Sequence, residues 1–184
     1  ICKYLDLPIQ HINDTLLRRM NRRGTAADIR RILKKARDMG FTLRTSLIVG
    51  FPGETEEQFQ EMMDFVEEAR FDRMGAFAFS PEENTPAAET PDQIPEEIKQ
   101  ERLDRLMKLQ AQISLENNQA RIGTVEKVLV TDARDGLFLG RSQREAPDAD
   151  GAIVFTAKEA PEVGSFVQVR ITGAETYDLK GERL

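Results

Sequence analysis

Residues 46–54 combine a strand-like run with a turn that could hold a ligand. They read Ser-Leu-Ile-Val-Gly-Phe-Pro-Gly-Glu, so two glycines and a proline follow an apolar run. In parallel β/α folds, ligands sit at the carboxyl ends of strands, and a glycine turn there lets the backbone approach the ligand. The alternative interpretation is a turn that only connects the strand to the next helix.

A group of polar side chains follows another short apolar run near the start of the chain. Asp6, Gln10, His11 and Asn13 lie at or beyond its end, where they could hydrogen-bond a ribose or an amino-acid group. His11 is the only histidine, and it could serve as a general base or as a ligand. The alternative is a structural or solvated histidine.

Two arginine-bearing segments could contact anions. The first holds four arginines within six positions: Arg18, Arg19, Arg22 and Arg23. Such a patch could clamp phosphate or carboxylate groups, or it could be a solvated helix face. The second segment, residues 140–151, is a polar loop with Arg141 and Arg144. Small β-barrels bind RNA or protein through loops of this kind.

Charge is unevenly distributed along the 184 residues, whose net charge is −6. Residues 1–40 hold ten basic and four acidic side chains, residues 41–123 hold eight and seventeen, and residues 124–184 hold eight and eleven. The acidic balance argues against indiscriminate nucleic-acid binding, but the basic first segment could still contact an anionic partner.

The single cysteine and the absence of long apolar runs exclude several classes of protein. Cys2 alone allows no internal disulfide and no Cys-based zinc or iron–sulfur site, and we expect a buried structural thiol. No apolar run approaches the ~18 residues of a transmembrane helix, and no export signal is visible, so we expect a cytoplasmic protein without membrane contact. Because the sequence does not begin with Met, we expect it to start within a longer protein.

The first two-thirds of the sequence alternates strand and helix patterns at intervals of roughly 30 residues, which predicts parallel βαβ units. Two helix starts carry capping-box pairs, Thr25 with Asp28 and Thr55 with Gln58. Pro95 suits the first turn of a long helix. The expected strands are 5–9, 42–49 and 74–79, and the expected helices are 15–20, 26–39, one after residue 55 and one from residue 95. Three such strands leave edges uncovered, so we expect part of a barrel or of a doubly wound sheet.

The pattern changes near residue 123 to short strands separated by turn residues. We expect strands at 125–130, 137–142, 152–156 and 166–174, with a fifth at 177–179, which together predict a small all-β barrel of about 60 residues. The expected domains are therefore 1–94, a linking helix at 95–123, and 124–184.

Four strings carry a resemblance to a known family. They are YLDLPIQHIN, RRMNRRGT, SLIVGFPGETEEQF and FAFSPEENTPAAE. Together they resemble the methylthiotransferases of the radical S-adenosylmethionine superfamily, in the order of the second half of that family's catalytic barrel. The part from about residue 124 is similar to the family's TRAM module. The resemblance implies the second half of a partial, TIM-like β/α barrel followed by a small antiparallel β-barrel.

Within that family the sequence is more similar to the RimO type than to the MiaB type. Residues 10–13 and the 140–151 loop look like the RimO type, which modifies an aspartate of a small-subunit ribosomal protein. The MiaB type modifies an adenosine in tRNA and has a different sequence after the first strand. The acidic TRAM-like segment also suits a protein target. The alternatives left open are a MiaB-type enzyme and a non-catalytic module that binds RNA or the ribosome.

The resemblance implies S-adenosylmethionine and two four-iron four-sulfur clusters as cofactors. The cluster cysteines should lie upstream of residue 1, so we expect no catalytic residue and no metal ligand in this chain, and no activity from the chain alone. The residues implied for S-adenosylmethionine are Asp6, Gln10, Ser46, Ile48, Gly50, Phe79 and Ser80. The residues implied for the ribosomal target, with RNA contact through the barrel, are Arg18, Arg19, Arg22, Arg23, Arg141 and Arg144. Ser46 stands where superfamily members have a glycine, which departs from the pattern.

Overall fold

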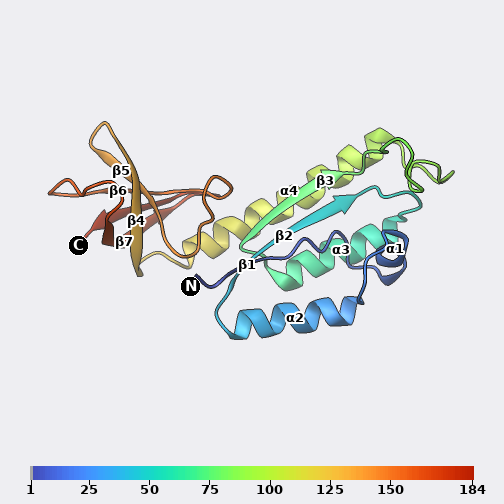
Figure 1. Ribbon diagram of the computed structural model, residues 1–184, viewed down its shortest axis with the longest axis horizontal. Coiled ribbons are helices and arrows are strands. Elements are labelled where there is room, and N and C mark those ends of the chain that lie inside the picture. Colours follow the sequence, from blue (N-terminus) through green and yellow to red (C-terminus); the bar gives the residue numbers. More distant parts are fainter. Residues whose placement is uncertain (1) are drawn as a thin grey trace. The chain divides into compact units, whose positions relative to one another are not determined.

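A computed structural model describes residues 2–184. The described chain divides into two compact units, one of residues 5–111 and one of residues 112–184 together with residues 2–4. We call them the sheet unit and the barrel unit (Figure 1). No helix within the described residues is long and apolar enough to span a membrane.

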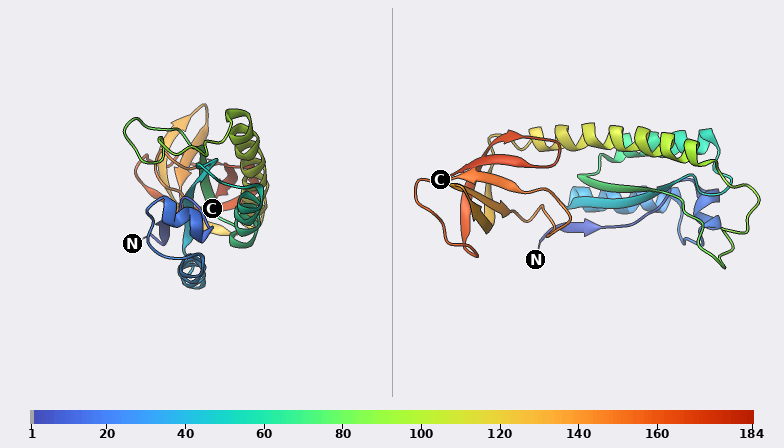
Figure 2. Two further views of the ribbon diagram at one scale, coloured as in Figure 1. Left: turned by 90° about the vertical axis from the view of Figure 1, so that its right-hand side faces the viewer. Right: turned by 90° about the horizontal axis from the view of Figure 1, so that it is seen from above.

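The sheet unit is built on three strands in the order β1-β2-β3. The strands are β1 (Tyr4–Asp6), β2 (Thr42–Val49) and β3 (Arg73–Ala78), and β2 pairs parallel to β3. The helices are α1 (Asp14–Arg19), α2 (Ala26–Asp38), α3 (Glu56–Ala69) and α4 (Glu96–Gln119), and α4 continues into the barrel unit. Figure 2 shows α3 and the first turns of α4 along the same side of the sheet. The predicted parallel β/α arrangement is confirmed.

Local sequence signals account for the helix starts. Thr25 Oγ1 accepts the Asp28 N–H, and the Asp28 carboxylate accepts the Thr25 N–H in return. Thr55 and Gln58 form the same reciprocal pair before α3. Both predicted capping boxes are confirmed. Each supplies partners to backbone N–H groups that the first helical turn leaves unpaired.

β1 is shorter than expected, although the extended chain keeps contact with β2 beyond it. The Gln10 N–H donates to the Ser46 carbonyl, and the Ile48 N–H donates to the Gln10 carbonyl. Gln10 has φ +70°, a left-handed conformation, so the segment after β1 does not continue as a regular strand.

The two faces of β2 have different surroundings. Leu43, Thr45, Leu47 and Val49 are buried, whereas the intervening residues 44, 46 and 48 are only partly buried. This alternation follows from the two-residue period of a strand. Residue 48 is paired with Phe77 of β3, which is 60% exposed, so the second face of the sheet is open.

The barrel unit closes five strands in the order β4-β5-β6-β8-β7. They are β4 (Val125–Arg134), β5 (Leu137–Arg141), β6 (Ile153–Thr156), β7 (Phe166–Ala174) and β8 (Leu179–Arg183). Alternate residues of these strands fill its core, among them Val128, Val130, Ile153, Phe155 and Val169.

Three expectations need correction. The fifth strand is Leu179–Arg183, because the Glu175 N–H donates to the Asp178 carbonyl and keeps the residues before it in a turn. One strand pair, β6 with β8, is parallel, so the barrel is not wholly antiparallel. Cys2 is exposed, so the expected burial is wrong; it precedes β1 and is not covered by the core.

Candidate functional site

A pocket of about 470 Å³ lies at the carboxyl ends of β1, β2 and β3. Its lining comes from the segments after β1 and β3, from α1 and the turn after it, from the end of β2 and from the loop that precedes α4. The lining residues are Gln10, Arg19, Met20, Asn21, Arg22, Ile48, Phe51, Phe79, Thr85, Pro86 and Ala87. Five residues of the predicted sites, Gln10, Ile48, Phe79, Arg19 and Arg22, therefore share one pocket.

The pocket has an apolar body with a polar rim. The Phe51 and Phe79 rings meet edge to face, with centroids 5.2 Å apart and planes at 72°. Ile48 adds an aliphatic wall from the end of β2, and Gln10 contributes a side-chain amide. An aromatic and aliphatic surface with a few convergent polar groups suits a flat heteroaromatic ring joined to a polar tail.

Two guanidinium groups stand at this rim. Arg22 donates to the Pro8 carbonyl, which ties the turn after α1 to the end of β1. Arg19 lies over Gly53, where any side chain would collide with its guanidinium, and comes within 4.0 Å of the Asp92 carboxylate. Planar guanidiniums of this kind can bind a carboxylate through two hydrogen bonds.

Beneath the pocket lies a buried ionic network that sequence reasoning missed. His11 is completely buried, and its Nε2 is 3.3 Å from Oε2 of the equally buried Glu54 side chain. Arg102 of α4 donates to the other oxygen of Glu54 at 2.7 Å, and the Gly50 N–H donates to that oxygen at 3.0 Å. His11 therefore acts as a structural partner rather than as a pocket residue.

A second cation of α4 supports the same turn. Lys99 Nζ donates to the Phe79 carbonyl at 2.9 Å, and its stem fills the space where a side chain at Gly50 would lie. Gly50 has φ +69°, a left-handed conformation that also favours glycine. Lys99 and Arg102 begin the buried stripe of α4, which continues through Leu106 and Gln110. In the sequence, Lys99 and Arg102 only share the helix face of Leu106, and this spacing does not reveal their partners from distant segments.

The remaining predicted cofactor residues lie outside the pocket lining. Asp6, the last residue of β1, forms an ion pair at 2.9 Å with Arg44 in the first half of β2. Ser46 lies on β2 between Arg44 and Ile48, and Ser80 is exposed after β3.

The remaining predicted target residues are also outside the pocket. Arg18 and Arg23 are exposed beside it, and Arg141 and Arg144 belong to the barrel unit.

The loop of residues 140–151 is held by an arginine with two carboxylates. Arg121 donates to both oxygens of Glu126, at 2.9 and 2.8 Å, and to Glu145 at 2.6 Å. Glu145 also accepts the Ser142 N–H at 2.8 Å. Burial tends to lower the pKa of Arg121, but the hydrogen bonds and charges of Glu126 and Glu145 outweigh it and raise that pKa.

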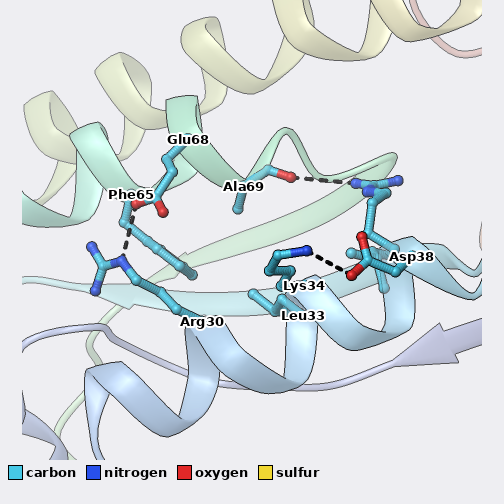
Figure 3. A pocket seen from close by; sticks show the side chains of 9 residues that line it. Arg30, Leu33, Lys34, Asp38, Phe65, Glu68 and Ala69 are labelled. Atoms are coloured by element: carbon cyan, nitrogen blue, oxygen red, sulfur yellow. Dashed lines mark hydrogen bonds and ion pairs between the residues drawn. The ribbon is translucent and has the colours of Figure 1, made fainter.

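A smaller cavity of about 260 Å³ lies between α2 and α3. Figure 3 shows its rim of ion pairs, Arg30 with Glu68 and Lys34 with Asp38, around an apolar floor that includes Phe65. Each of these cations is already paired with a carboxylate. The other residues that line the cavity do not indicate a particular ligand.

The part of the chain that the structure describes contains no group of three or more His, Cys, Asp or Glu side chains that could hold a metal ion. These residues therefore do not fit an iron–sulfur cluster. The pocket of Ile48, Phe51 and Phe79 with Gln10 and the two arginines does fit a nucleoside with an amino-acid tail.

Comparison with known proteins identifies both parts of the chain. A model of the radical SAM superfamily matches residues 1–66, and a TRAM domain model matches residues 122–184. The chain thus joins a radical SAM segment to a TRAM domain.

Over 187 aligned residues the chain is 53% identical to the ribosomal protein uS12 methylthiotransferase RimO of Geobacter sulfurreducens and 49% identical to that of Geotalea uraniireducens. Each alignment covers 99% of this chain and 42% of the relative. A relative of the same name from Heliobacterium modesticaldum is 50% identical, with 100% of this chain and 40% of the relative covered. Over nearly its whole length the chain matches these RimO-type relatives, and it spans 40–42% of their length.

Proposed function

We propose that the chain supplies the S-adenosylmethionine-facing pocket and the target-docking surface of a methylthiotransferase that modifies an aspartate of ribosomal protein uS12. The pocket at the carboxyl ends of β1–β3 is the observation that supports this assignment most directly. A ribosomal substrate also implies that the reaction takes place in the cytoplasm.

In this proposal, Ile48, Phe51 and Phe79 contact the adenine, because flat aromatic rings pack well against apolar and aromatic side chains. Gln10 hydrogen-bonds the ribose or the methionine amino group, and Arg19 or Arg22 pairs with the methionine carboxylate. When bound together with its iron–sulfur cluster, S-adenosylmethionine supplies the radical that removes a hydrogen from the target carbon.

The exposed Arg18 and Arg23, beside the pocket, are proposed to meet an anionic part of the ribosomal target. Arg141 and Arg144 lie in the 140–151 loop of the barrel unit and are proposed to assist. A TRAM domain is compatible with RNA contact, and ribosomal RNA close to uS12 would supply phosphates for these cations.

A chimera tests the proposal directly. The segment of the Geobacter sulfurreducens relative that matches this chain is replaced by the chain, and the purified, cluster-loaded chimera is incubated with ribosomes and with tRNA. We expect one methylthio group on uS12 by mass spectrometry. Modification of tRNA instead of uS12 would favour the MiaB-type alternative, and RNA binding without either modification would favour the non-catalytic module.

Two isoleucines provide a matched test of the pocket. Ile48→Ala should weaken S-adenosylmethionine affinity about tenfold, because it removes one apolar wall, measured by calorimetry on the chimera. Ile32→Ala changes the same side chain on the exposed face of α2 and should leave affinity unchanged. Gln10→Ala should also weaken binding. Equal affinities for the Ile48 and Ile32 variants would refute the assignment of the pocket.

A further inference from the structure

The protonation of His11 follows from its surroundings. Its Nδ1 accepts the backbone N–H groups of Ile12 at 2.9 Å and Asn13 at 3.0 Å. A nitrogen that accepts two N–H groups carries no hydrogen of its own, so the single ring hydrogen is on Nε2. Nε2 faces the carboxylate of Glu54 at 3.3 Å. His11 is therefore neutral, with a fixed ring orientation that turns Nε2 toward Glu54.

Glu54 connects three separate parts of the sheet unit. One oxygen faces His11, which follows β1, and the other accepts from Gly50, which follows β2, and from Arg102 of α4. A buried carboxylate needs several donors, because desolvation disfavours its charge. The contacts of Glu54 with His11, Gly50 and Arg102 therefore relate the segment after β1 to the turn after β2.

The segment after β1 and the turn after β2 each contribute a residue to the pocket lining. Gln10 immediately precedes His11, and Phe51 lies between Gly50 and Glu54. Neither His11, Glu54 nor Arg102 lines the pocket itself. We propose that His11, Glu54 and Arg102 are positioning residues that hold the Gln10 and Phe51 walls at the separation required for ligand binding. The identity of that ligand rests on the proposed function.

Glu56 provides the matched control for Glu54. Its carboxylate pairs with the same arginine, Arg102, at 3.3 Å, but its side chain is 54% exposed and is also paired with Arg105. Glu54→Gln and Glu56→Gln therefore remove the same charge from two partners of one guanidinium. Of the two residues, only Glu54 also contacts His11 and Gly50, so only Glu54→Gln alters those contacts.

Two measurements on these variants test the positioning role. In the chain itself, amide NMR spectra should show Glu54→Gln moving the resonances of Gln10 and Phe51, while Glu56→Gln leaves them in place. In the chimera, Glu54→Gln should weaken S-adenosylmethionine affinity about tenfold or more, and Glu56→Gln by less than about twofold. Nitrogen NMR should show the His11 ring hydrogen on Nε2 in the wild-type chain.

A double-mutant cycle separates positioning from general stability. His11→Ala and Glu54→Gln should each weaken affinity, and the double variant should be no weaker than the worse single variant, because both break one connection. Additive losses, or a lowered melting temperature with unchanged pocket resonances and affinity, would overturn the positioning role. If the wild-type chimera fails to bind S-adenosylmethionine, the proposed function is wrong. The amide resonances of Gln10 and Phe51 in the Glu54→Gln variant still test the positioning role in that case.

Discussion

The sheet unit and the barrel unit each bury an arginine, but with opposite charge balances. In the sheet unit, one buried carboxylate, Glu54, is shared by Arg102, a backbone N–H and the neutral His11. In the barrel unit, one arginine, Arg121, is shared by two carboxylates, Glu126 and Glu145. Glu54 therefore joins the segments around the pocket, whereas Arg121 joins the 140–151 loop to the rest of the barrel.

This difference predicts which arginine is harder to replace. Arg121→Leu should destabilise the barrel unit by about 3–5 kcal/mol, because it removes the buried guanidinium that pairs with two carboxylates of little exposure. Arg102→Leu should cost the sheet unit less, because Glu54 keeps the Gly50 N–H and His11. Hydrogen exchange, read separately for amides of each unit, measures both losses.

The exposed Arg144 of the same loop provides the control. Arg144→Leu should change barrel stability by less than about 0.5 kcal/mol. A loss for Arg102→Leu as large as that for Arg121→Leu would contradict the distinction between the two networks.

The features that the sequence predicted well depend on short-range chemistry. β2 has the expected bounds of 42–49, and both capping boxes form, because alternation and caps involve residues within a few positions of one another. The Gly-rich turn after β2 does lie at the pocket. Its sequence allowed either a ligand-binding turn or a plain connection to the next helix, and the shared edge of parallel strand ends is the reason the first was considered.

Short-range patterns did not predict the buried network of His11, Glu54 and Arg102. Glu54 meets His11 and Arg102 from distant parts of the chain, and either partner alone resembles an ordinary surface residue in the sequence. The barrel shows the same limit, since the parallel pairing of β6 with β8 depends on closure between non-neighbouring strands. Contacts between distant segments follow from the tertiary fold rather than from local spacing.

Acid should destabilise the barrel unit through Glu126. Burial tends to raise the pKa of Glu126, but the hydrogen bonds and charge of Arg121 outweigh it, so its folded-state pKa lies below the ordinary value. A lowered folded-state pKa contributes stability above the unfolded-state value of about 4.3, and this contribution is lost as pH falls through the folded-state pKa. Barrel hydrogen exchange measured between neutral pH and about pH 3 should show this loss.

Glu126→Gln removes the titrating group while keeping its size. The variant should be less stable than the wild type at neutral pH, and its stability should fall less steeply below about pH 4. The same slope in both proteins would show that other carboxylates govern the acid sensitivity of the barrel.

The smallest effect is expected at an exposed ion pair within α2, at the rim of the cavity (Figure 3). Lys34 and Asp38 lie 2.6 Å apart, but their side chains are 76% and 62% exposed, and solvent screens such pairs. The lysine also precedes the aspartate, which is the less favourable order along a helix. Lys34→Ala should therefore change stability by less than about 0.5 kcal/mol. Leu33→Ala, one position earlier but buried, should cost about 2–5 kcal/mol in the same unfolding measurement. A loss for Lys34→Ala close to that for Leu33→Ala would show that this exposed ion pair stabilises the unit as much as a buried apolar side chain, contrary to the expected screening by solvent.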